Sequence, residues 1–184
     1  MKKLCMLAFG LVPAASMAVL FDFNNASTGQ WASAAQTVDG ITATASGVGG
    51  NLTVLNWGGS PVVAGGFSGN WLATRVDFNY GMTSVSAMFG DNGTDDDGSV
   101  IFTAYDSANN VLDQQMFAYG TSSGFASLTV TGSNIAYVIG STSGTQFPNS
   151  VVWDNFSAQP VPEPATIAAL GLGAAALMRR RARR

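Results

Sequence analysis

The chain has 184 residues, only 10% of them charged, and its formal net charge of −3 conceals a contrast between the ends and the middle. Residues 19–160 hold one arginine, Arg75, and ten aspartates, a net charge of −9 that disfavours binding to nucleic acid or anionic lipid. There is no histidine, and the one cysteine is Cys5, so residues 19–160 have no disulfide, no His or Cys zinc site and no mechanism with a histidine base.

The N-terminus has the three parts of a secretory signal peptide. Two lysines precede an apolar run over residues 4–12, and small residues follow, with Ser16 and Ala18 at the −3 and −1 positions. We therefore predict a signal helix within residues 1–18, export through the Sec translocon and cleavage by signal peptidase after Ala18. An N-terminal membrane anchor is the alternative, but the apolar run has about nine residues where a span needs roughly 20.

Short alternating runs, separated by glycine, asparagine, serine and aspartate, fill residues 19–160. In residues 99–105 successive side chains alternate between two faces, the period of a β-strand, and Asn109-Asn110 then predicts a hairpin turn. The candidate strands are Val19–Phe23, Thr37–Ala45, Asn51–Trp57, Leu72–Phe78, Thr83–Phe89, Ser99–Tyr105, Val111–Phe117, Phe125–Thr131, Ile135–Ile139 and Val151–Phe156. About ten strands without an internal repeat predict an all-β domain, an antiparallel two-sheet β-sandwich or jelly roll.

Aspartates concentrate in residues 91–98. Four carboxylates within seven residues repel one another unless a cation or water screens them, and Ca²⁺ accepts oxygen ligands from irregular loops, although this spacing is not that of an EF-hand. The candidate calcium ligands are Asp91, Asp95, Asp97 and, in the last strand, Asp154, with Asp22 in the first strand as a further contributor. The alternative is a solvated hairpin loop, with the strand aspartates facing solvent.

Aromatic rings offer a second kind of site, because sugars stack on them. Trp57 and Trp71 lie next to glycine-containing loops and are our candidate ligand-binding residues, the alternative being a place in the core or at its rim. Further stacking groups are Trp31, Trp153, Tyr80, Tyr105 and Tyr119. An aspartate pair is able in principle to hydrolyse glycosides, but nothing in the sequence marks one carboxylate as an acid, so we expect no enzyme activity.

The last 24 residues combine an extended motif, an apolar run and a basic end. The motif, within residues 161–166, contains Val161, Pro162, Glu163 and Pro164, whose two prolines disfavour a helix. Residues 164–178 predict a short transmembrane helix. The basic tail, residues 179–184, holds five arginines that we expect on the cytoplasmic side of the inner membrane: Arg179, Arg180, Arg181, Arg183 and Arg184. This is a stop-transfer arrangement, and a plain single-span anchor is the alternative.

The tail closely resembles the PEP-CTERM sorting signal, with Pro162, Glu163 and Pro164 carrying the match. The resemblance implies recognition and cleavage by an exosortase, followed by release or re-attachment in the cell envelope or extracellular matrix. Residues 76–157 also resemble the β-sandwich ectodomains of such proteins, which are similar to galactose-binding-like jelly rolls; the match lies in residues 84–91, 95–97, 103–106 and 152–156.

From these features we expect an exported, non-catalytic protein of the cell envelope or extracellular matrix, associated with exopolysaccharide or biofilm. The alternative is a lectin-like carbohydrate-binding module, with or without dependence on Ca²⁺.

Overall fold

The computed structural model describes residues 17–182 except residues 58, 68, 92–96, 120–123, 145–147 and 163. The chain divides into two compact units, one of which is residues 17–161; the other includes the C-terminal helix α1 (Pro164–Ala182). Within the described part of residues 17–161 every regular element is a β-strand, which confirms the all-β prediction. The predicted signal helix at residues 1–18 lies almost wholly outside the described residues.

Among the described residues, twelve strands form a continuous antiparallel sheet, with the main order β10-β9-β11-β8-β12-β6-β5-β2. Their bounds are β1 (Val19–Phe21), β2 (Gly29–Trp31), β3 (Ala34–Val38), β4 (Ile41–Gly47), β5 (Leu52–Trp57), β6 (Ser60–Phe67), β7 (Asn70–Leu72), β8 (Thr74–Asp91), β9 (Asp97–Tyr105), β10 (Val111–Ala118), β11 (Gly124–Gly144) and β12 (Val152–Pro160). Hydrogen bonds thus connect all these strands into one antiparallel sheet, and the two-sheet arrangement of a sandwich or jelly roll stays a prediction.

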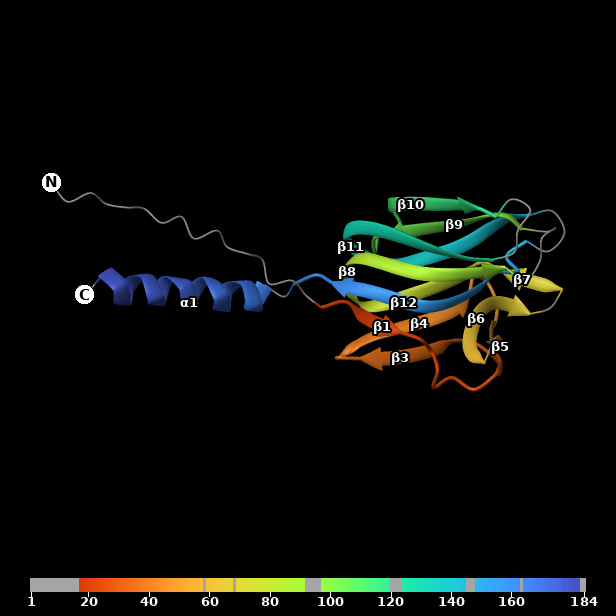
Figure 1. Cartoon of the computed structure of the whole chain (residues 1–184), viewed down its shortest axis with the longest axis horizontal. Coiled ribbons are helices and arrows are strands. Elements are labelled where there is room, and N and C mark those ends of the chain that lie inside the picture. The colour runs from red at the N-terminus through yellow and green to blue at the C-terminus, as the bar shows by residue number, and fades with distance from the viewer. Residues whose placement is uncertain are drawn as a thin grey trace. The chain divides into compact units, whose positions relative to one another are not determined.

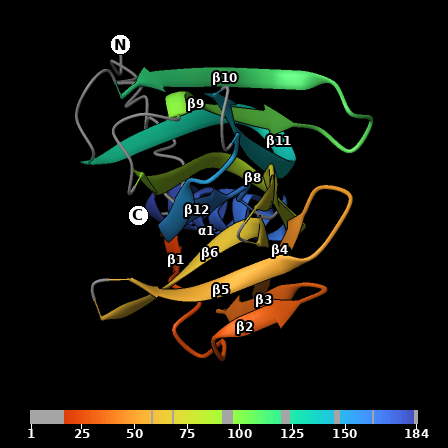
Figure 2. The same ribbon diagram turned by 90° about the vertical axis from the view of Figure 1, so that its right-hand side faces the viewer.

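Two long strands, β8 and β11, hold this sheet together. They pair from one end of β8 to the other, from Gly124 opposite Asp91 to Gly140 opposite Thr74 (Figure 1). The first half of β8 also pairs with β4, and its second half pairs with β12. The remaining strands therefore spread from different halves of one ribbon, with β9 and β10 on one side and β6, β5 and β2 on the other (Figure 2).

One turn divides a segment that the sequence suggests is a single strand. Residues 37–45 contain Asp39-Gly40, and both residues have positive φ, 51° and 78°, while Val38 and Ile41 pair on either side of them. This is the geometry of a two-residue hairpin turn, for which Asp-Gly is a favoured sequence. The prediction of one strand over Thr37–Ala45 was therefore wrong, and the segment forms the hairpin β3–β4.

Two breaks predicted between strands are instead irregularities within them. The candidate strands Thr83–Phe89 and Phe125–Thr131 each continue into a neighbouring candidate, giving β8 and β11. Register shifts between Thr131 and Tyr137 absorb the extra residues of β11 as β-bulges. Strand β6 was missed, because its proline and two glycines weaken the strand pattern.

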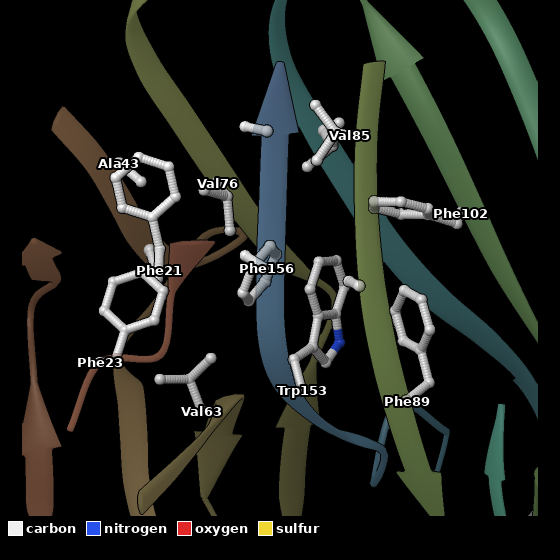
Figure 3. Packing of buried hydrophobic residues seen from close by; sticks show 14 of the residues in the cluster. Phe21, Phe23, Ala43, Val63, Val76, Val85, Phe89, Phe102, Trp153 and Phe156 are labelled. Atoms are coloured by element: carbon white, nitrogen blue, oxygen red, sulfur yellow. The ribbon is translucent and has the colours of Figure 1, made fainter. Parts of the chain in front are cut away.

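The core packs around the indole of Trp153. Its ring centroid lies 4.7 Å from that of Phe89, 5.6 Å from Phe102 and 5.2 Å from Phe156, and Trp153 is only 2% exposed (Figure 3). Gly140 lies against the indole so closely that any Cβ would overlap it. Burying a large apolar side chain stabilises a fold by roughly 1.5–3 kcal/mol, so this aromatic cluster is a main contribution to stability. Trp153 is a core residue, not the stacking platform considered from the sequence.

Candidate functional site

The C-terminal motif begins where the β domain ends. The last strand, β12, stops at Pro160, and the N–H of Val161 donates a hydrogen bond to the carbonyl of Gly81 at 2.9 Å. Pro162 is half-buried, and Glu163 lies outside the described residues. Helix α1 then starts at Pro164, a favourable position because proline has no N–H to leave unpaired in the first turn. The motif therefore forms the connection between the last strand and the helix.

Helix α1 agrees with the predicted position of the apolar run but extends further. It continues past Met178 to Ala182, so that Arg179, Arg180 and Arg181 occupy its last turn, where cations interact favourably with the negative end of the helix dipole. In the described part of the chain, no helix has both the length and the apolar character that a membrane crossing requires. The predicted helix is thus confirmed, whereas its role as a transmembrane span is not.

A comparison with protein families decides what this tail is. A family model described as the PEP-CTERM protein-sorting motif matches residues 160–184. The C-terminus is a PEP-CTERM sorting motif. The match confirms the prediction of such a motif over residues 161–184 and begins one residue earlier, at the last residue of β12.

The other end of the β domain lies directly after the predicted cleavage point. Met17 and Ala18 are exposed and precede the first strand, and Val19, at the start of β1, is buried. Strand β1 pairs with β12, the strand that leads into the PEP-CTERM motif. Both ends of the domain are therefore fixed by neighbouring strands, and the residues that hold the core all lie between Ala18 and the motif.

Of the four candidate calcium ligands, the structure describes only the side chain of Asp154. Asp95 lies outside the described residues, as do the side chains of Asp91 and Asp97. Asp154 is opposite Met88, and three residues along β8 place it about 10 Å from the level of Asp91. Among the described residues no three acidic, histidine or cysteine side chains gather as a metal site would require. A calcium site at Asp91, Asp95, Asp97 and Asp154 therefore stays a prediction.

Asp154 has Asp22 as its acidic neighbour instead. Desolvation by burial raises the pKa of the Asp154 carboxyl, a hydrogen bond from the N–H of Asn155 opposes this, and the nearby charge of Asp22 adds to the rise. Asp22 has the opposite shift: hydrogen bonds from Asn24 and Gln36 lower the pKa of its carboxyl against the effect of burial. Protein donors thus stabilise the charged form of Asp22, whereas burial disfavours the charged form of Asp154.

The two candidate tryptophans pack against the same small apolar cluster, apart from the main core. In β5, Leu52 and Val54 point into the main core, and the alternation of a strand turns Leu55 and Trp57 to the other face. There Trp57 and Trp71, both half-buried, pack with Leu55 on three buried residues: Val62, Ala64 and Val152. The prediction placed each tryptophan beside its own loop; in the fold both pack against this cluster, Trp57 opposite Ser60 at one end of β6 and Trp71 opposite Gly66 near the other.

Phe125 joins this group, a residue that the sequence analysis did not single out. Its ring centroid lies 5.8 Å from that of Trp57, and the side chain is 56% exposed. The partnership could not be seen in the sequence, because 67 positions separate Trp57 from Phe125 and only the pairing of the strands brings them together. We call Trp57, Trp71 and Phe125 the tryptophan cluster. Its one well-exposed ring and two half-buried rings cover the edge of the small apolar cluster and also expose aromatic surface to solvent.

Comparisons of the rest of the chain with known proteins do not identify a ligand or an activity. No curated protein matches the chain in sequence. Among solved structures, a variant of a family 29 carbohydrate-binding module is similar at TM-score 0.42 and 12% identity, covering 77% of this chain and 91% of that one. The K2 adhesin domain of Lys-gingipain gives 0.44 and 16%, covering 77% and 99%, and the K1 adhesin domain from Porphyromonas gingivalis gives 0.43 and 12%, covering 79% and 99%. Scores and identities this low carry no argument about the ligand or activity of this chain.

Proposed function

We propose that this protein is an exported, non-catalytic component of the cell envelope or extracellular matrix that an exosortase processes at its PEP-CTERM motif. The observation that carries the proposal is the motif itself, at residues 160–184 directly after the last strand. In this proposal the Sec translocon exports the chain, signal peptidase cleaves after Ala18, and the processed domain is retained among exopolysaccharides of the matrix or biofilm.

The ends of the β domain are compatible with both cleavages. Removal of residues 1–18 leaves β1 whole, because that strand starts at Val19. Cleavage at Pro162–Pro164 leaves β12 whole and keeps the hydrogen bond from Val161 to Gly81. Neither cut removes a residue of the hydrophobic core, so the domain is expected to stay folded after processing.

We further propose that α1 holds the chain in the inner membrane only until processing. Its apolar part, residues 164–178, is about 22 Å long at 1.5 Å per residue, shorter than the hydrocarbon core of roughly 30 Å. Such a helix relies on local thinning of the bilayer and on arginine side chains that extend towards the cytoplasmic surface. Weak anchoring of this kind suits a transient intermediate better than a permanent anchor.

Mass spectrometry of the mature protein tests the processing. The full chain is produced in cells with and without an exosortase, and its C-terminal peptide is identified in the extracellular and membrane fractions. We expect the extracellular form to end within residues 161–164 and to lack the five arginines. Glu163→Ala is expected to leave the tail attached, whereas the control Gly171→Ala, in α1 and outside the Pro162-Glu163-Pro164 segment, is expected to be processed normally. An extracellular form with an intact arginine tail contradicts the proposal.

Carbohydrate binding at the tryptophan cluster is a second candidate function. The observation that favours it is the exposed ring of Phe125 beside Trp57, next to the small cluster against which Trp71 also packs. A glycan array probed with the full chain, with and without EDTA, tests both binding and the proposed role of Ca²⁺ at Asp91, Asp95 and Asp97. We expect Trp57→Ala to weaken binding and Trp31→Ala, which removes an exposed ring from β2, to leave it unchanged. Absence of binding in both conditions ends this candidate.

A further inference from the structure

A second group of polar and aromatic side chains lies on the outer face of the β4-β8-β11-β9 part of the sheet. Strand pairing places Thr44 opposite Asp77, Asp77 opposite Tyr137 and Tyr137 opposite Tyr105. These four side chains form one row across four adjacent strands, about 14 Å long at the usual strand spacing. Arg75 stands beside the row, two residues from Asp77. We call these five residues the arginine face.

Contacts within the arginine face hold its side chains in place. Arg75 and Asp77 form a bidentate ion pair, in which Nε donates to Oδ2 at 2.8 Å and Nη2 donates to Oδ1 at 2.6 Å. The Arg75 guanidinium lies 3.7 Å from the centre of the Tyr137 ring, and Tyr105 stacks on that ring at 4.8 Å with planes 8° apart. The Tyr137 hydroxyl donates to Oδ1 of Asn109 at 2.9 Å.

The fixed positions of these side chains favour binding, because side chains that are already held in place lose little conformational entropy when a ligand binds. Stability alone does not account for the arrangement. The side chains of Arg75 and Asp77 are 36% and 42% exposed, and exposed ion pairs contribute only about 0–1 kcal/mol. Arginine and tyrosine are, however, among the residues that contribute most to binding surfaces.

The charges of this face select the chemistry of a partner. Arg75 is the one cation of residues 19–160, and its charge is balanced by Asp77, so the face is neutral within a domain of net charge −9. A polyanion would be repelled by the domain and would find no unpaired cation on the face. A neutral polyol meets no such barrier.

The ion pair still has hydrogen-bonding capacity for hydroxyl groups. A guanidinium has five N–H donors, and the bonds to Asp77 engage two of them, which leaves three without a partner among the described residues. Asp77 supplies acceptor oxygens beside these donors. Neighbouring hydroxyls of a sugar each need both a donor and an acceptor, which the Arg75–Asp77 pair presents together, and Tyr105 adds a half-exposed ring for the apolar side of the sugar.

We propose that the arginine face binds a neutral polysaccharide chain lying across strands β4, β8, β11 and β9. Arg75 and Asp77 hydrogen-bond its hydroxyls, and Tyr105 contacts a sugar ring. The row is long enough for several consecutive sugar units, so an oligosaccharide binds better than a single sugar. This site is separate from the tryptophan cluster and does not depend on PEP-CTERM processing.

Affinity electrophoresis tests the proposal with the full chain in mild detergent. The gels contain hydroxyethylcellulose or glucomannan as neutral probes, and alginate as an anionic one. We expect retardation by at least one neutral polymer and none by alginate. Arg75→Gln and Tyr105→Ala should each weaken the interaction about tenfold, the loss expected when a hydrogen bond to a charged group or a ring contact is removed. Trp31→Ala, in β2 at the other end of the strand order, is the matched control.

Several outcomes overturn the proposal. One is the absence of retardation by both neutral polymers, and another is stronger retardation by alginate. If binding is lost in Trp57→Ala but kept in Arg75→Gln, the tryptophan cluster is the glycan site and the arginine face is not. Urea unfolding of each variant accompanies the gels, and the surface position of Arg75 predicts a stability within about 1 kcal/mol of the natural chain. If Tyr105→Ala loses binding but is also unfolded, Tyr105→Phe, which keeps the ring, decides the matter. Binding retained by Tyr105→Phe supports the site, and binding lost by it counts against the site.

Discussion

Gly140→Ala tests the packing around Trp153 directly. A Cβ at this position would overlap Cζ2 and Cη2 of the indole and lie 2.6 Å from Cε2, whereas carbon atoms in contact need about 3.5–4.0 Å. The ring has little room to withdraw, because Phe89, Phe102 and Phe156 surround it at centroid distances of 4.7, 5.6 and 5.2 Å. We therefore expect a loss at the upper end of the range for overpacked cores, about 3 kcal/mol.

This loss is large beside a total stability of about 5–15 kcal/mol and corresponds to a fall in Tm of roughly 10 °C. Urea unfolding followed by circular dichroism measures it. Gly171→Ala, in α1, where a Cβ meets nothing within 4 Å, is the control and should change stability by less than about 0.5 kcal/mol.

A double mutant separates the clash from other effects of the substitution. All three atoms that the new Cβ would meet belong to the six-membered ring of the indole, and Trp153→Phe replaces the two fused rings with a single, smaller ring. Gly140→Ala combined with Trp153→Phe should therefore lose less stability than the two single losses added together, with a coupling of about 1 kcal/mol or more. Additive losses, or a Gly140→Ala variant as stable as the natural chain, would refute the packing argument.

Two further predictions concern aspartates on the sheet. The N–H of Thr131 donates to Asp113, the main cause of the lowered pKa of that carboxyl, so its stabilising effect should be complete above about pH 4 and disappear as the pH falls through the lowered pKa. Urea unfolding should show Asp113→Asn less stable than the natural chain at pH 7, with the difference closing near pH 2; a constant difference contradicts this. The pKa of Asp154 is raised, chiefly by burial, so its charge opposes folding at neutral pH. Asp154→Asn should therefore gain stability at pH 7 and lose that gain below about pH 4, and a destabilised variant at pH 7 would show that its hydrogen bonds matter more.

The features that the sequence predicted well depend on neighbouring residues. Alternation over residues 99–105 identifies β9, because each side chain of a strand faces opposite to the one before it. The PEP-CTERM tail can be recognised in the sequence for a similar reason, since its proline-rich motif, apolar helix and basic end follow one another directly along the chain. Even the wrong prediction of a single strand over Thr37–Ala45 had a local cause, the unrecognised turn at Asp39-Gly40.

Long-range pairing decided the rest. The chain alone did not reveal that β8 and β11 run unbroken, because the polar residues at their midpoints are typical of loops, and only hydrogen bonds to distant strands keep them extended. Nor did it show that Trp57 and Trp71 pack against the same apolar cluster, or that Asp154 lies near Asp22.

The amino-acid sequence by itself therefore determined the all-β class of the domain and the presence of the C-terminal sorting motif, because both follow from local periodicity and from the order of short segments. The tertiary structure decided which side chains share a surface, including the arginine face, whose row joins Thr44, Asp77, Tyr137 and Tyr105. The physical reason is that strand register is fixed by the packing of one shared core. Shifting a strand by a single residue would turn every side chain to the opposite face.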